Sequence, residues 1–277
     1  MAATRPPIEV LPLFSVLDQH LLNLLRGLSP ADWQRPTLAR QWTVKDVTAH
    51  LLDGNLRALS MLRDGHFADA PSGSYEGLVD FLNGLNADWV RAARRLSPQQ
   101  LLELLATSGA AYTAFLASLD PWAPAAFAVA WAGESESLNW FHIAREYTEK
   151  WHHQQQIHAA VDGPGLLAPA LLEPFVATCL RGLPHAYRAI AAPVGTVVEI
   201  RIATLGSVWQ LVRGGAGWQL HTERPVAAPA AGVIIQPDTA WRLFTKGISP
   251  AEALPQVQLA GNPELARAAL HLVAVMA

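Results

Sequence analysis

Residues 138–160 read LNWFHIAREYTEKWHHQQQIHAA, and this stretch decides the fold of the N-terminal half and its candidate chemistry. No proline interrupts it, Ser137 stands where an N-cap residue would, and an Asp-Gly-Pro-Gly turn at 162–165 ends it. The stretch therefore predicts one long helix. On that helix, five polar side chains fall within about 80° of one another: His142, Glu146, Glu149, His153 and Gln156.

Two members of this polar stripe have the spacing of metal ligands. Glu149 and His153 are four residues apart, so both head groups can reach one point beside the helix. A metal site in a bundle needs a further ligand from a facing helix. His50 is the best candidate, because it points inward among apolar neighbours and Gly54 leaves room beside it. We therefore predict an open site with three protein ligands, where water or substrate takes the remaining positions.

Each part of this site also has a plainer interpretation. A single inward histidine is often a hydrogen-bonded core residue, and a Glu-x-x-x-His pair is often a half-buried surface pair. A solvated helix face is the alternative for His142 and Glu146. We expect His152 and His158 to point away from the cluster and lie at the surface. Cys179, the single cysteine, excludes an internal disulfide framework, and we expect it to be buried and inert.

The preceding residues also carry helical patterns. Thr43 and Asp46 can form a capping box at the start of one helix, and Ser97-Pro98 supplies a cap and a first-turn proline for another. Together with the helix at 138–160, these patterns predict a bundle with four principal helices, of the up-and-down or crossover type. The stretches with apolar side chains at helical spacing are 9–27, 44–63, 75–96 and 98–119.

The pattern changes after Gly165. A helical stretch broken near Pro184 is followed by short segments that alternate at period two, with glycine-rich turns between them. We predict a helical domain at 1–163 and a small α+β domain at 164–277. The predicted strands are 194–203, 206–213, 217–222, 232–235 and 256–260, and the predicted helices are 169–190, 237–244 and 262–275.

Composition excludes several classes of protein. Hydrophobic residues make up 51% of the 277 residues and charged residues 16%, which allows a sizeable core and argues against a disordered chain. The formal charge of −3, with scattered basic residues, argues against nucleic-acid binding. No uninterrupted apolar run reaches the roughly 18 residues of a membrane span, and the N-terminus is unlike a signal peptide. We expect a cytoplasmic protein without a membrane or nucleic-acid partner.

Two motifs make the chain similar to the mycothiol-dependent maleylpyruvate isomerase family, a branch of the DinB-like metal-binding bundles. The pattern W-T-V-x-D-V-x-x-H-L is matched at 42–51, and R-x-x-x-E-x-x-x-H is matched at 145–153, before a Gly-Pro-Gly turn. The C-terminal half resembles the sterol-carrier-like module of this family at 179–188 and 259–270. The chain departs from the family at 39–41, where Cys-Pro-Gly is often found, and at Gln156, where an aspartate is often found.

The resemblance implies a DinB-like four-helix bundle followed by a sterol-carrier-like α+β domain. It also implies that His50, Glu149 and His153 hold a divalent metal, usually taken to be zinc, although nickel or iron would also suit these ligands. Its cosubstrate would be a low-molecular-weight thiol such as mycothiol. An open metal can bind this thiol and favour the thiolate, which adds to an electrophilic double bond. Bond rotation and thiol expulsion then give cis–trans isomerisation, whereas stopping after addition gives thiol transfer.

The leading hypothesis is therefore a metal-dependent isomerase or thiol S-transferase that acts on a small electrophilic molecule. In it, Glu146 or His142 moves a proton and Arg145 holds a carboxylate. One alternative is a non-catalytic protein that binds metal or a small ligand, with an apolar ligand in the C-terminal domain. Another is a metal-dependent hydrolase that uses the same three ligands. A monomer and a homodimer are both compatible with the sequence.

Overall fold

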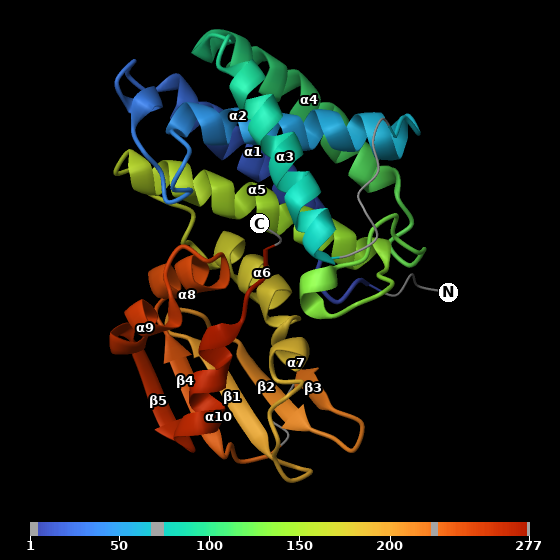
Figure 1. Ribbon diagram of the computed structural model, residues 1–277, viewed down its shortest axis with the longest axis vertical. Helices are drawn as coiled ribbons and strands as arrows, with labels where there is room; N and C mark the ends of the chain where they lie inside the picture. The colour runs from blue at the N-terminus through green and yellow to red at the C-terminus, as the bar shows by residue number, and fades with distance from the viewer. Residues whose placement is uncertain (1–4, 68–74, 223–226, 276–277) are drawn as a thin grey trace. The chain divides into compact units, whose positions relative to one another are not determined.

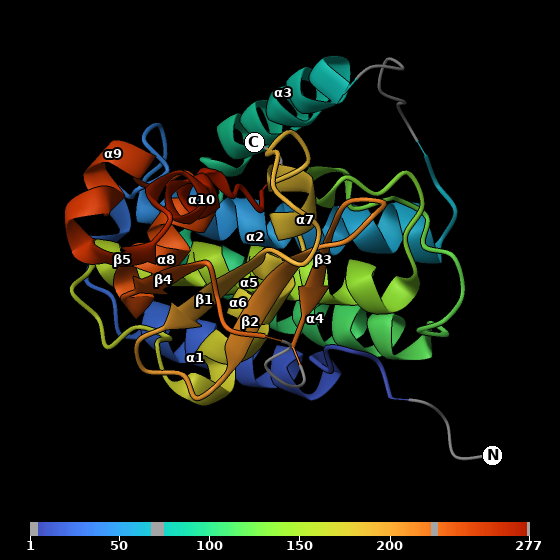
Figure 2. The same ribbon diagram turned by 90° about the horizontal axis from the view of Figure 1, so that it is seen from below.

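The computed structural model describes residues 5–67, 75–222 and 227–275 (Figures 1 and 2). Within these ranges the chain forms two compact units. The first contains the residues up to 126 and 138–166, and the second contains 127–137 and 167–275. The chain thus enters the second unit briefly before the long helix begins. The predicted domain boundary at residue 163 stays a prediction, because compactness alone does not show which part folds independently.

The first unit is a helical bundle, as predicted. Four of its helices pack against one another, and α3 packs on the outside of α2 (Figure 2). The helices begin and end within a few residues of the predicted stretches: α1 (Leu11–Arg26), α2 (Val44–Ala58), α3 (Tyr75–Ala93), α4 (Pro98–Ser118) and α5 (Asn139–Ala160).

The start of α2 follows the predicted capping box. The Thr43 hydroxyl accepts a hydrogen bond from the Asp46 backbone N–H, and the Asp46 carboxylate accepts one from the Thr43 backbone N–H. Arg94 donates two further hydrogen bonds to this carboxylate, at 3.0 and 3.2 Å. Asp46 therefore joins the start of α2 to the end of α3, a contact that helical spacing alone does not predict. After Ala58 the chain continues as a π-helical turn at Leu59–Arg63.

The predicted cap at Ser137 is wrong. The N-cap residue of α5 is Leu138, and no side chain caps this helix. The Ser137 hydroxyl instead accepts a hydrogen bond from the Val129 backbone N–H and donates one to the Glu134 carboxylate. The hydroxyl closes the preceding loop because that loop folds back on itself in the second unit.

By length and composition alone, α4 would qualify as a membrane-spanning helix, the one such helix in the described part of the chain. This helix is not an uninterrupted apolar run, because Glu103 lies within it. The core helix of a bundle passes the same test. Helix α4 buries an apolar face in this way, and the large side chains on that face are Leu101, Leu105, Tyr112 and Leu116.

The core of the first unit lies between these helices. Phe14 of α1 makes edge-to-face contacts with Tyr112 of α4 and Tyr147 of α5. Asp18 of α1 forms an ion pair with Lys150 of α5, 2.6 Å between Oδ1 and Nζ. An apolar cluster of the core is shared by α1, α2, α4 and α5, and its buried members include Leu21, Leu25, Val47, Leu52, Leu101, Leu105 and Ile157.

The second unit is a five-stranded sheet with short helices, an α+β architecture as predicted. The strand order is β3-β2-β1-β4-β5, with β1 and β4 parallel and the other neighbours antiparallel. Helix α10 packs against β4 and β5 (Figure 1). The strands are β1 (Val197–Ile202), β2 (Val208–Arg213), β3 (Trp218–His221), β4 (Ala231–Ile235) and β5 (Val257–Gly261).

The helices of the second unit are shorter than predicted at the C-terminal end. Instead of one helix over 262–275, the chain forms α10 (Pro263–Ala268), a 3-10 turn and then extended backbone. The chain leaves the helix because the Ala274 backbone N–H donates to the Phe244 carbonyl. The other helices are α6 (Pro169–Leu180), α7 (Leu183–Ala186), α8 (Pro237–Phe244) and α9 (Pro250–Ala253).

Candidate metal centre

The structure brings the three predicted metal ligands together. His50 lies on α2, and Glu149 and His153 lie one turn apart on α5. One ligand atom from each residue lies within 4.8 Å of the other two. His153 Nε2 is 3.4 Å from Glu149 Oε2, and the His50 and His153 rings are 4.6 Å apart between centroids at 70°. Two helices distant in sequence therefore present three donors of suitable type at one point, although the role of these residues stays a prediction.

The state of His50 suits a metal ligand. Its Nδ1 is buried and has no hydrogen-bond partner among the described residues. Burial lowers the pKa of His50 well below its ordinary value, and the neighbouring His153 lowers this pKa further. The ring is thus neutral with a free lone pair, as metal binding requires. Trp42 covers the ring at 4.9 Å between centroids, so the tryptophan of the first motif forms a wall of the cluster.

The hydrogen bonds around His153 also suit a cation. Its Nδ1 is 3.0 Å from Gln156 Oε1, an atom that can only accept, so Nδ1 donates. When the ring is neutral, the lone pair on Nε2 then faces the Glu149 carboxylate. His153 Nε2 and Glu149 Oε2 are 3.4 Å apart, and a cation bound between these two acceptors would satisfy both. The donor set of two imidazoles and one carboxylate fits zinc and other first-row divalent ions.

Glu149 connects the cluster to solvent. Its side chain is 38% exposed, compared with 11% for His153. Burial alone would raise the pKa of Glu149, but the neighbouring imidazoles outweigh it, because a proton carried by His153 Nε2 would be shared with this carboxylate; this pKa therefore lies well below its usual range. The carboxylate is therefore ionised. An alanine-sized side chain at Gly54 would meet no atom within 4 Å, so space is open beside His50 on α2, as predicted.

The predictions for His152 and His158 are wrong, because both side chains are buried rather than at the surface. The His152 ring packs on His153 at 3.9 Å between centroids, and its Nδ1 lies 2.8 Å from the Thr148 carbonyl. His158 lies near the turn that ends α5, where the Gly165 N–H points to its Nδ1. Most of α5 is buried, so angular position on the helix did not separate a core face from a solvent face.

The three predicted catalytic residues form a second polar group on α5, separate from the metal-ligand cluster. Arg145 Nη2 is 2.8 Å from Glu146 Oε1 and 2.8 Å from His142 Nδ1. Tyr112 of α4 donates a hydrogen bond of 2.7 Å to Glu146 Oε2. Sequence reasoning missed Tyr112, because its position on the apolar stripe of α4 indicates a core residue. The sequence did carry one indication of this role, because the hydroxyl of a buried tyrosine needs a hydrogen-bond partner.

Charge is fixed within this second group. Burial alone would raise the pKa of Glu146, but Arg145 and the hydrogen bonds from Tyr112 and Arg145 outweigh it and lower this pKa. Burial, followed by the charge of Arg145, lowers the pKa of His142 to about 4. Glu146 is therefore ionised and His142 neutral near pH 7. Because Arg145 donates to His142 Nδ1, the ring proton lies on Nε2, which is buried without a partner among the described residues.

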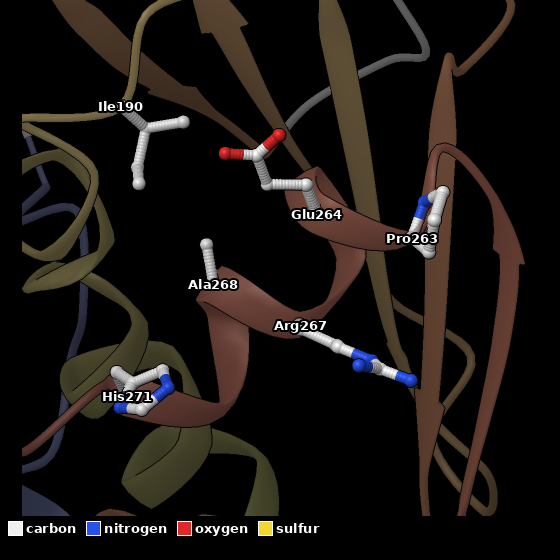
Figure 3. A pocket seen from close by; sticks show the side chains of 6 residues that line it. All are labelled: Ile190, Pro263, Glu264, Arg267, Ala268 and His271. Atoms are coloured by element: carbon white, nitrogen blue, oxygen red, sulfur yellow. The ribbon is translucent and has the colours of Figure 1, made fainter.

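The single cysteine lies elsewhere: Cys179 belongs to the second unit and is buried, as expected. The second unit has a mostly apolar hollow of about 440 Å³, formed largely by α10 and the following turn opposite Ile190 (Figure 3). The side chains that line it are Ile190, Pro263, Glu264, Arg267, Ala268 and His271.

Comparison with known proteins identifies the family of this chain and solved structures that share its fold. The family model described as the mycothiol maleylpyruvate isomerase N-terminal domain matches residues 14–158. No curated protein matches the sequence. A solved structure of the mycothiol-dependent maleylpyruvate isomerase is 13% identical with a TM-score of 0.50, covering 84% of this chain and 86% of that one. A mutant of that enzyme, with one histidine replaced by alanine, is 13% identical with a TM-score of 0.51, covering 90% and 91%. At this identity the likeness shows a shared fold.

Proposed function

Since the chain belongs to the family of the mycothiol maleylpyruvate isomerase N-terminal domain, we propose that it is a metal-dependent thiol enzyme. Its reaction would be cis–trans isomerisation of a small electrophilic alkene, or thiol transfer to it, with a low-molecular-weight thiol such as mycothiol. The observation that carries this proposal is the convergence of His50, Glu149 and His153 within 4.8 Å.

These three residues would hold the metal, with zinc as the first candidate and nickel or iron as others. When bound, such a metal supplies a Lewis acid that lowers the pKa of a coordinated thiol and so favours the thiolate near neutral pH. Two neutral imidazoles and one carboxylate leave a net positive charge on a divalent ion, which attracts an anionic partner. Trp42 restricts water on one side of His50, and the space beside Gly54 admits a ligand.

In isomerisation, the thiolate sulfur bonds to one alkene carbon while the π electrons move onto the conjugated carbonyl. Rotation about the resulting single bond precedes the reverse step, in which the C–S bond breaks and the thiolate leaves. No net proton or electron is consumed, so a dedicated proton carrier is not required. This agrees with the fixed charges of Glu146 and His142.

The second polar group would then bind rather than transfer protons. Glu146 holds Arg145 in place on the helix that carries two metal ligands. Arg145 contributes positive charge toward a substrate carboxylate, and His142 Nε2–H offers a hydrogen bond to an acceptor. These roles refine the predicted ones, in which Glu146 or His142 moved a proton.

The test is elemental analysis of protein purified without a histidine tag, comparing wild type with Glu149→Gln. We expect about one metal ion per wild-type chain and its loss in the variant, while Glu103→Gln on the exposed face of α4 retains it. The loaded protein is then assayed for isomerisation of a cis-unsaturated keto acid with and without mycothiol. Formation of a hydrolysis product without added thiol would indicate a hydrolase. Absence of both metal and turnover would favour the non-catalytic binding protein.

A further inference from the structure

Gln156 is a buried side chain that contacts the candidate metal ligand His153. It is 6% exposed, and its Oε1 lies 3.0 Å from His153 Nδ1. The amide oxygen has no proton to give, so it holds the His153 proton on Nδ1 and directs the Nε2 lone pair toward Glu149 and His50. One hydrogen bond thus sets both the tautomer and the rotation of the ring.

The partner of a metal-bound histidine also sets the charge of the site. A carboxylate at this position would add a negative charge next to the imidazole and strengthen it as a ligand. An amide orients the ring without adding charge. With a divalent ion, Glu149 and two neutral histidines, the site then keeps a net charge of plus one. A site of this charge binds an anion such as a thiolate more readily than a neutral site does.

We propose that Gln156 is a positioning residue that orients His153 and, by being neutral, keeps the centre selective for an anionic ligand. This inference rests on the proposed metal site and adds the reason for an amide at this position. It predicts that replacing the amide by a carboxylate and removing it altogether change metal affinity in opposite directions. A residue that only filled space would not produce opposite effects.

The neighbouring Gln155 supplies a matched control. It lies on the same helix, is also buried, and accepts a hydrogen bond of 2.7 Å from the Leu166 backbone N–H. Its amide therefore holds the turn that follows α5 and is not bonded to a candidate metal ligand. Gln155→Leu should lower the melting temperature without changing metal affinity.

The experiment compares wild type, Gln156→Glu, Gln156→Leu and Gln155→Leu. Zinc affinity is measured by competition with a chromophoric chelator, and azide affinity by absorption of the cobalt-loaded protein. We expect Gln156→Leu to bind zinc about 10- to 100-fold more weakly and Gln156→Glu to bind it about tenfold more tightly. We expect Gln156→Glu to bind azide more weakly than wild type, because its added charge repels the anion.

The outcomes separate this inference from the proposed function. If wild type binds zinc and Gln156→Glu binds zinc and azide as wild type does, the inference is wrong. That variant has the shape of glutamine and decides the matter even if Gln156→Leu does not fold. If wild type binds no zinc, both the metal site and the inference fail. If the affinities change as expected but no thiol-dependent turnover is found, the inference stands and the proposed function fails.

Discussion

Two helical glycines, Gly54 of α2 and Gly84 of α3, should each gain stability on replacement by alanine. A Cβ built at either position meets no atom within 4 Å. Glycine in a helix interior costs about 0.5–1 kcal/mol relative to alanine, because the unfolded chain loses more conformational freedom. We therefore expect Gly54→Ala and Gly84→Ala each to raise the free energy of unfolding by about that amount.

Gly109 of α4 should behave in the opposite way. A Cβ at this position would lie 2.7 Å from Asp18 Oδ2. Asp18 cannot move freely, because its other oxygen is 2.6 Å from the buried ammonium of Lys150. Loosening this partly buried ion pair costs about 1–3 kcal/mol, which exceeds the helix-propensity gain of about 1 kcal/mol. Gly109→Ala should therefore be destabilising by about 1 kcal/mol.

Urea unfolding followed by circular dichroism measures all three variants against wild type. The activity assay then separates the two stabilised ones. Gly54→Ala places a methyl group in the open space beside His50 and should reduce thiol-dependent turnover, whereas Gly84→Ala should leave turnover unchanged. Destabilisation by Gly54→Ala would show that the space beside His50 is filled. A neutral Gly109→Ala would show that Asp18 is not held by Lys150, and either result would refute the reasoning.

The remaining predictions concern buried polar groups and one helix cap. Burial lowers the pKa of His142 and His158 from 6.5 to about 4. Because the unfolded chain takes up a proton at these histidines more readily than the native protein does, the free energy of unfolding is highest above pH 6.5 and falls as the pH falls toward 4. The loss is about 2 kcal/mol for each histidine between pH 7 and 5. As the pH is lowered, the urea midpoint of His158→Gln should therefore fall less steeply than that of wild type. Equal slopes for the two proteins would contradict this. Tyr112→Phe removes a hydrogen bond to an ionised carboxylate and should cost about 1.5–3 kcal/mol by the same assay; an unchanged midpoint would show that the bond contributes nothing. Thr43→Ala should cost about 1 kcal/mol and Thr43→Ser much less, so equal losses would argue against the cap.

The features that could be predicted from the sequence are those with local causes. The Thr43–Asp46 capping box and the Ser97-Pro98 start of α4 each depend on residues within one turn, and both are confirmed. The approach of His50 to Glu149 and His153 is not local, but it follows from two helices of a bundle that turn their polar positions toward each other. Spacing on α5 and one inward histidine on α2 were enough to indicate it.

The features that could not be predicted depend on contacts made by distant segments. Ser137 has the chemistry of a helix cap, but a loop that folds in the second unit uses its hydroxyl instead. His152 and His158 lie off the polar stripe, and a rule based on one exposed face fails for a helix that is buried on nearly all sides. Tyr112 belongs to an apolar stripe by spacing and to a polar network by its hydroxyl alone.

The placement of two candidate ligands on one helical turn has a consequence for metal loading during folding. Glu149 and His153 remain four residues apart whenever that turn is helical, so an incompletely folded chain can already chelate an ion weakly. His50 joins only when α2 packs against α5. Capture would thus proceed in two stages, weak and then strong. Because the incompletely folded chain would also bind, an ion in the proposed site would stabilise the native state by less than its affinity for the native protein alone implies. Incompletely folded chains would therefore compete with native chains for the same metal ions.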